Sequence, residues 1–459
     1  MNIRTNELKP TKTNLIKTLL SDSIDRNESL KKFVAFCNQV DFGCSIAIDG
    51  RWGDGKTFFV KQTKLVIDSY NDYYDSGLSI EERDSIRKSL SQNGFSTEGF
   101  IPQVTVYYDA WKNDNDEDPL LSIIYEICRS LSVDFPNIDN KKFVEKAVIV
   151  AESFTGKGCK SILNMIKGEN PVQTIENNKT IEELIADFLN TLLYERGDRI
   201  VVIIDELDRC RPTYAVQLLE RIKHYFDNDR ITFIFSTNLE QLQHSIGALY
   251  GNEFDSNRYL DRFFDYKISL PPANMQKYYA SIGININNTM YSFDRMCELV
   301  ATHYSFALRE TEKYIRTAMI AAYKPTHRDS GWGFADTRGY NFGFMIIVPL
   351  MVGLRMVNPK QYYDFIEGNN SEPLIEVLKD YQISYRLCAN LLNEDESYDK
   401  ESERKKKVLL EDKLQDVYDA IFNKDMLWSE KTVGNCEFSF RTKIELLKAA
   451  NLLSEYADY

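Results

Sequence analysis

The stretch SIAIDGRWGDGKTFFVKQ, residues 45–62, passes from an apolar segment through three glycines to a lysine and a hydroxyl. Gly50, Gly55, Lys56 and Thr57 fit the spacing G-x-x-x-x-G-K-[ST]. In this phosphate-binding loop (P-loop), backbone N–H groups cradle phosphates, the lysine reaches the outer phosphates, and the hydroxyl binds Mg²⁺. The alternative is a glycine-rich turn that matches the spacing by chance.

The segments on either side of the loop have the pattern that a P-loop needs. Residues 44–49 (CSIAID) form a short apolar run typical of a buried strand, and residues 57–69 have helical periodicity. The start of the helix adds a favourable dipole for anions, and Gly53 frees the loop backbone further. The residues that we expect to contact the nucleotide here are Gly50, Arg51, Trp52, Gly53, Asp54, Gly55, Lys56, Thr57 and Phe58.

Composition limits the classes of protein that the chain can belong to. Its 459 residues, 43% of them apolar, are enough for two or three packed domains. The 56 basic and 69 acidic residues give a net charge of −13, which argues against a broad surface for DNA or anionic membranes but leaves a local basic groove open. The eight cysteines form no C-x-x-C pair, so we expect reduced thiols in a cytoplasmic protein.

Two segments bear on export and membranes. The first twenty residues lack the long apolar core of a signal peptide, so we expect no export. Residues 344–354 (FMIIVPLMVGL) are the most apolar segment, about eleven residues against the ~20 needed to span a bilayer. We predict a buried helix or strand there and no integral membrane segment. A membrane-dipping segment or a partner-binding surface is the alternative.

Apolar runs alternate with helical patterns through the first half of the chain, which predicts an α/β layered domain. The β-branched run 199–204 is typical of a central strand in a parallel sheet covered on both faces. From residue 273 the pattern is mainly helical, so we expect domains at 1–272 and 273–459. The predicted strands are 44–49, 103–108, 199–204, 231–236 and 266–270, with polar insertions at 66–100 and 133–180 and a solvated helix or linker at 393–407.

Asp205 and Glu206 follow the run 199–204, where a carboxylate can hold the magnesium of a bound nucleotide. Glu206 is the candidate that orients an attacking water and accepts its proton. A turn at the end of a strand would explain an isolated Asp-Glu pair equally well. Its position after a buried strand, together with the upstream P-loop, favours a nucleotide site.

Four further residues are candidates for contacts with the γ-phosphate or the transition state. Asn238 follows the next predicted strand and could touch the phosphate or the water, although an N-cap on the following helix is equally plausible. Arg258 and Arg262 could stabilise charge in the transition state, within the chain or across an oligomer interface, with exposed surface salt bridges as the alternative. Arg309, on a later helix, could reach back to the nucleotide.

Five motifs in order resemble the KAP family of P-loop NTPases over roughly residues 20–320. They are IDGRWGDGKTFFVK, YYDAWKNDNDEDPLLSIIYEI, VVIIDELDRCRPTYAVQLLERIKHYF, FSTNLEQLQHSIGALYG and RYLDRFFDYKISLP. The resemblance implies a five-stranded parallel sheet of order 5-1-4-3-2 and ATP with Mg²⁺ as the ligands. It also implies that Asp205 is the magnesium carboxylate and Glu206 the catalytic one. Asp208-Arg209-Cys210 looks like a family signature without a derivable role, and we expect Cys210 to be packed rather than reactive.

The sequence departs from the family in one respect. Many KAP proteins carry transmembrane helices inserted in the P-loop domain, whereas residues 66–100 and 133–180 are too polar for that. The chain therefore resembles the soluble bacterial type, whose relatives are associated with exclusion of bacteriophage. This association is an analogy at the level of the family.

The leading hypothesis is an ATPase whose cycle switches a conformation or an assembly. Residues 273–459 contain no recognisable effector motif, so we expect a homo-oligomer or a complex with an effector protein. The first alternative is a DNA-stimulated motor or loader, which the net charge does not favour. A scaffold that binds ATP without hydrolysing it and a small-molecule kinase are the remaining alternatives.

Overall fold

The computed structural model divides the chain into two compact units, Leu8–Asn274 and Met275–Tyr459 with Met1–Glu7. The predicted insertion 133–180 lies outside the described residues, as do residues 92–98 and 393–399 of two other predicted segments. The residues described are 9–91, 99–116, 118–131, 181–194, 196–226, 228–251, 253–282, 292–326, 338–379, 400–423 and 430–451.

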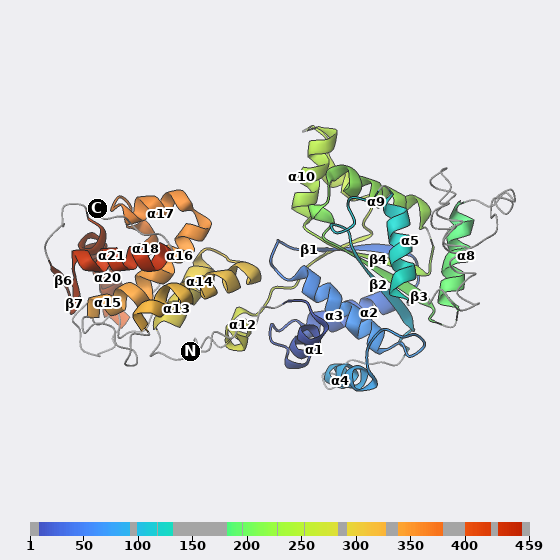
Figure 1. The fold of residues 1–459 in the computed structure, drawn as a ribbon, viewed down its shortest axis with the longest axis horizontal. Helices are drawn as coiled ribbons and strands as arrows, with labels where there is room; N and C mark the ends of the chain where they lie inside the picture. Colours follow the sequence, from blue (N-terminus) through green and yellow to red (C-terminus); the bar gives the residue numbers. More distant parts are fainter. Residues whose placement is uncertain are drawn as a thin grey trace. The chain divides into compact units, whose positions relative to one another are not determined.

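A five-stranded sheet of order β2-β3-β4-β1-β5 forms the centre of the first unit (Figure 1). Every neighbouring pair in this sheet is parallel. Read from the other edge, the order is 5-1-4-3-2, which confirms the prediction. The strands are β1 (Cys44–Asp49), β2 (Gln103–Asp109), β3 (Arg199–Asp205), β4 (Ile231–Thr237) and β5 (Tyr266–Ser269).

Helices cover both faces of this sheet and bury it in two separate apolar clusters. Ile200, Val202 and Ile204 of β3 belong to one cluster, and Val201 and Ile203 belong to the other, because successive side chains of a strand point to opposite faces. On the first face lie α5 (Pro119–Ser130), α8 (Ile181–Leu193), α9 (Pro212–Tyr225) and α10 (Leu239–Tyr250). On the second lie α1 (Lys12–Ser21), α2 (Asn27–Gln39), α3 (Lys56–Ser69) and α4 (Ile80–Ser91).

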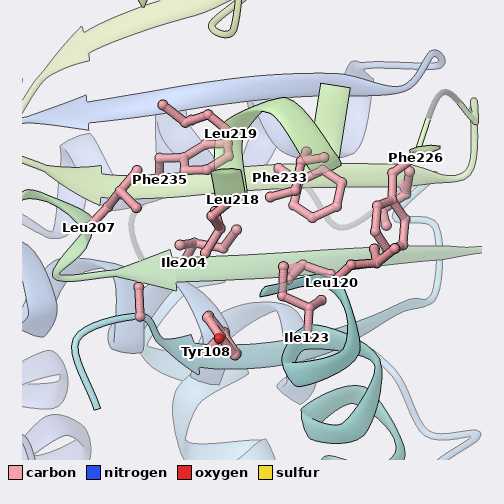
Figure 2. Packing of buried hydrophobic residues seen from close by; sticks show 14 of the residues in the cluster. Tyr108, Leu120, Ile123, Ile204, Leu207, Leu218, Leu219, Phe226, Phe233 and Phe235 are labelled. Atoms are coloured by element: carbon pink, nitrogen blue, oxygen red, sulfur yellow. The ribbon is translucent and has the colours of Figure 1, made fainter. Parts of the chain in front are cut away.

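The packing on the first face joins strands that are far apart in the sequence. Figure 2 shows Tyr108 of β2, Ile204 of β3 and Phe235 of β4 in the same cluster as Leu120 of α5 and Leu219 of α9. These residues are almost completely buried. Since apolar burial contributes roughly 25 cal/mol per Å², this cluster is a major source of the stability that holds the strands in order.

Three strands continue one residue beyond the apolar run that predicts them. The last residues of β2, β3 and β4 are Asp109, Asp205 and Thr237, because the hydrogen-bonded ladder does not end where the apolar side chains end. Asp205 pairs with Asp109 on one side and with Ser236 on the other. Asp49, the last residue of β1, pairs with Thr237. Polar side chains therefore line one edge of a sheet that is otherwise apolar.

The second unit is mainly helical, as predicted, and adds one small antiparallel hairpin of β6 (Lys431–Val433) and β7 (Cys436–Phe438). Its described helices are α12 (Met275–Ser281), α13 (Ser292–His303), α14 (Leu308–Thr326), α15 (Arg338–Phe342), η3 (Gly343–Ile347), α16 (Val348–Val357), α17 (Pro359–Ile366), α18 (Glu372–Leu378), α20 (Lys400–Phe422) and α21 (Phe440–Asn451).

The apolar segment 344–354 is part of a continuous helix that runs from Arg338 to Val357. Among the described residues this is the one helix long and apolar enough to cross a membrane, and 67% of its most apolar window is buried inside the structure. Its middle part, η3, is a π-helix. Pro349 has no amide hydrogen and its ring crowds the carbonyl four residues earlier, which explains the wider turn at this point. The burial is that of a core helix, as the sequence predicts.

Gly353 of α16 lies in close contact with side chains of α13 and α14. A Cβ atom on this residue would lie 2.3 Å from Val300 Cγ1 and 3.2 Å from Tyr314 Cε2. We expect Gly353→Ala to destabilise the chain by about 1–3 kcal/mol because α13 and α14 cannot both move away. Thermal unfolding followed by circular dichroism measures the effect, and Val300→Ala in the same chain should restore part of the loss.

Gly247 of α10 is the matched control. A Cβ atom there would lie 3.4 Å from Ser256 Oγ, an ordinary contact. Gly247→Ala should therefore be neutral or stabilising by roughly 0.5–1 kcal/mol, because alanine restricts the unfolded chain more than glycine does. Equal losses for the two variants would contradict this account of the packing around α16.

Candidate nucleotide site

The glycine-rich loop joins β1 to α3, which is the strand, loop and helix arrangement that the sequence predicts. Gly53 and Gly55 have φ values of 92° and 91°, in the left-handed region that favours glycine. The carboxylate of Asp54 accepts a hydrogen bond of 3.0 Å from the backbone N–H of Arg51. Trp52 and Arg51 are exposed, whereas Phe58 is buried in the core beneath the loop. The loop is therefore a closed turn supported by the first turn of α3.

Lys56 is folded against this loop. Its Nζ donates hydrogen bonds to the backbone carbonyls of Gly50, at 2.6 Å, and Arg51, at 3.2 Å. Burial lowers the pKa of the Lys56 amine, and the carboxylates of Asp208 and Asp205 act in the opposite direction. Lys56 is 9% exposed, and its ammonium group lies in the electrostatic field of the carboxylates at and just after the end of β3.

Asp205 is held by two donors at the end of β3. Its Oδ2 accepts from the Tyr107 hydroxyl at 2.7 Å, and its Oδ1 accepts from the backbone N–H of Glu206 at 3.0 Å. Burial, with the Asp205 charge as the next cause, raises the pKa of Tyr107, so this phenol stays a neutral donor. The Asp205 carboxylate and the Thr57 hydroxyl are oxygen ligands of the kind that Mg²⁺ prefers.

Glu206 has an unusual backbone for a residue with a side chain. Its φ of 61° and ψ of 28° are left-handed, a conformation that costs free energy and that clusters at functional sites. Its Oε2 lies 2.5 Å from Nε of Arg209, and the Arg209 guanidinium stacks over the Trp111 ring at 5.3 Å. Burial raises the pKa of Glu206 and Asp205 acts in the same direction, while Arg209 opposes them.

Asp208 connects three segments of the site. Its Oδ2 accepts a hydrogen bond from the indole N–H of Trp52 in the loop, and its Oδ1 accepts one of 3.1 Å from the Thr237 hydroxyl at the end of β4. The sequence identified Asp208, Arg209 and Cys210 as a signature but gave them no role, since these partners lie far away in the chain. Burial raises the pKa of Cys210 well above its usual range, which fits a packed thiol.

Asn238 is the N-cap of α10, one of the two roles expected for it. Its side-chain oxygen accepts a hydrogen bond of 3.2 Å from the backbone N–H of Gln241. It directly follows Thr237, which pairs with Asp49 next to the P-loop, so Asn238 lies at the polar edge of the sheet. A contact between Asn238 and the phosphate or the water stays a prediction.

Arg258 and Arg262 form no hydrogen bond or ion pair with this cluster in the described part of the chain. Arg258, in α11 (Ser256–Leu260), and Arg262 are exposed and form no ion pair within the described part of the chain. The alternative of a surface salt bridge is therefore not seen there. Arg309 is exposed at the start of α14 in the other unit. Roles for all three stay predictions.

Comparison with known proteins identifies the class to which this loop, sheet and carboxylate arrangement belongs. The model of the KAP family P-loop domain matches residues 14–319, so the chain belongs to this family of P-loop NTPases. No match was found among curated proteins. Among solved structures, the ORC2 protein of Aeropyrum pernix in ADPNP-ADP complexes is 13% identical, with 95% of this chain and 93% of that chain covered and a TM-score of 0.29.

The link made by Asp208 can be tested by stability alone. Asp208→Ala should cost about 1–3 kcal/mol, because the Thr237 hydroxyl, at 0% exposure, loses its acceptor in the interior. Adding Thr237→Val removes the hydroxyl that has lost its acceptor. The double variant should therefore recover part of the lost free energy of unfolding, measured by urea denaturation. Strictly additive losses in the double variant would show that the two side chains do not depend on each other.

Proposed function

We propose that the protein binds ATP with Mg²⁺ in this loop and hydrolyses it. Membership of the KAP P-loop family supports nucleotide binding. The observation that carries the proposal of hydrolysis is the position of Lys56 in the electrostatic field of Asp205, Glu206 and Asp208. One compact site thus combines a phosphate-binding cation, a metal-type carboxylate and a candidate base.

Each part of the site has a separate role in this proposal. The backbone N–H groups from Gly53 to Thr57 and the Lys56 ammonium bind the phosphates. Thr57 and Asp205 hold Mg²⁺, which neutralises phosphate charge when bound. Glu206 orients the attacking water and accepts its proton, and its ion pair with Arg209 limits where the carboxylate can lie.

The output that we propose is a nucleotide-driven change of conformation or assembly, in a cytoplasmic protein. β5 ends at Ser269, and the helical unit begins a few residues later at Met275. Any movement of the nucleotide edge of the sheet can therefore reach the helical unit through a short piece of chain. A homo-oligomer or an effector protein would receive the change, and a role in anti-phage defence rests on family analogy alone.

Two substitutions separate binding from hydrolysis. Lys56→Ala should weaken ATP binding strongly, because the loop loses the cation that faces the phosphates. Glu206→Gln should keep ATP binding and lower turnover by about 10²–10⁴-fold, the usual contribution of a positioned base. Equilibrium binding of a fluorescent ATP analogue and steady-state phosphate release measure the two effects.

The same assays decide between the proposal and its alternatives. Tight ATP binding and unchanged turnover in Lys56→Ala would overturn the assignment of the P-loop. Wild-type binding without any turnover would support a non-hydrolysing scaffold. Duplex and single-stranded DNA added to wild-type protein should leave turnover unchanged, and strong stimulation would favour a motor or loader.

If the exposed Arg262 completes the nucleotide site of a neighbouring chain, it acts across an oligomer interface. Chains with Arg262→Ala, which keep Glu206, mixed with Glu206→Gln chains, which keep Arg262, should then recover some activity that neither has alone. Turnover measured across mixing ratios tests this expectation. If no ratio gives more turnover than the sum of the two separate preparations, an arginine in trans has no support. Arg258→Ala is tested in the same way.

A further inference from the structure

Arg26 is a buried cation next to the P-loop that the nucleotide chemistry above does not use. It directly precedes α2 and is 4% exposed. Its Nη1 donates a hydrogen bond of 2.8 Å to the backbone carbonyl of Asp54, inside the loop. Its Nε is buried and has no hydrogen-bond partner among the described residues.

The electrostatics of this position are unfavourable without an anion. Burial lowers the pKa of Arg26 to about 10, and the nearby Asp54 charge only partly opposes this effect. No carboxylate within the described part of the chain forms an ion pair with the guanidinium. A buried charge of this kind costs free energy unless it is compensated. An anion bound in the loop would supply that compensation.

The hydrogen bond from Arg26 also fixes the direction of one peptide group. The described peptide bonds are all trans, and in a trans peptide the carbonyl and the N–H point in opposite directions. Because the Asp54 carbonyl points to Arg26, the N–H of Gly55 points away from it. In a P-loop this N–H belongs to the group that faces the phosphates.

That peptide would otherwise rotate easily. The left-handed Gly53 and Gly55, at φ 92° and 91°, lie on either side of Asp54, and glycines adopt alternative backbone conformations at little steric cost. The guanidinium holds the carbonyl from outside the loop. It therefore selects one orientation of the Asp54–Gly55 peptide before any ligand arrives, which reduces the cost of binding.

The turn that carries Arg26 is itself held in place. The side chain of Asn27 donates to the Leu19 carbonyl at 2.6 Å. Asn274 donates from its backbone N–H to the carbonyl of Ile24 at 2.9 Å and from its side chain to Asp25 Oδ2 at 3.2 Å. The arginine thus extends from a rigid support that also contacts the last residue of the first unit.

We propose that Arg26 is a positioning residue for nucleotide binding, which acts by holding the Asp54–Gly55 peptide with its N–H toward the phosphates. This inference rests on the proposed function, since it needs a nucleotide in the loop. Arg26 itself touches the loop and not the reacting atoms. Its loss should therefore weaken nucleotide affinity more than it lowers the rate of the bound state.

Arg199 provides a matched control elsewhere in the same unit. It is 6% exposed and its Nη2 donates to the carbonyls of Phe42, at 2.8 Å, and Asp229, at 3.0 Å. Its Nη1 is buried without a partner among the described residues, as is Nε of Arg26. Arg199 begins β3, whereas Asp205 of the nucleotide site ends it. If removing any buried arginine weakened nucleotide binding, substitution of Arg26 and substitution of Arg199 should weaken it equally.

The experiment compares Arg26→Met, Arg26→Lys and Arg199→Met with the wild-type chain. Equilibrium binding of a fluorescent ATP analogue with Mg²⁺ gives Kd, and phosphate release gives KM and kcat. We expect Arg26→Met to raise Kd and KM about tenfold or more, as for loss of a hydrogen bond to a charged group. We expect a smaller change in kcat, partial rescue in Arg26→Lys, and a wild-type Kd in Arg199→Met.

The outcomes distinguish this inference from the proposed function. If the wild-type chain binds the analogue no better than Lys56→Ala does, the proposed function fails. If the wild-type chain binds and Arg26→Met has the same Kd, only the role of Arg26 is overturned. Equal weakening in Arg199→Met would also overturn it. If circular dichroism shows that Arg26→Met does not fold, Arg26→Gln, which is uncharged and too short to reach the carbonyl, is read in the same way.

Discussion

Parallel pairing of β1, β3 and β4 is the constraint on which the rest of this site depends. The pairing aligns Asp49, Asp205 and Thr237 at one edge of the sheet. Apolar clusters on both faces hold the register, because a slip of one residue would turn every buried side chain of β3 to the opposite face. The position of a carboxylate opposite the P-loop is therefore a consequence of packing that lies well away from the chemistry.

The residues after β3 convert this edge into a connected site. Asp208 contacts the loop through Trp52 and contacts β4 through Thr237, while Arg209 contacts Glu206 and stacks on Trp111 after β2. Burial weakens solvent screening, so the opposite charges of Lys56 and these carboxylates interact more strongly than they would at a surface. A short segment thus joins the loop and two further strands, which gives the Asp208-Arg209 signature a physical meaning.

The sequence predicted the parts of the fold that depend on local pattern. Five apolar runs between helices predicted the strands to within a residue at their ends, and the spacing from Gly50 to Thr57 predicted the P-loop. The family resemblance supplied the strand order. The contacts of Asp208 and Arg26 could not be predicted in this way, because each depends on a partner brought near by the tertiary fold. Arg26 lies 28 residues before Asp54 in the chain and carries no motif of its own.

The surroundings of Arg26 also show how a P-loop can be connected to a distant part of a chain. One turn contacts the loop at Asp54 through Arg26 and contacts Asn274 through the carbonyl of Ile24. The next residue, Met275, begins the helical unit. A ligand that tightens the Asp54–Gly55 peptide would restrain the turn, and a restrained turn would restrain Asn274. If nucleotide binding changes the affinity for a partner that contacts Asn274, linkage requires that this partner change the affinity for nucleotide by the same factor. The hydrogen bonds of this turn therefore run from Asp54 in the loop to Asn274, which directly precedes the helical unit.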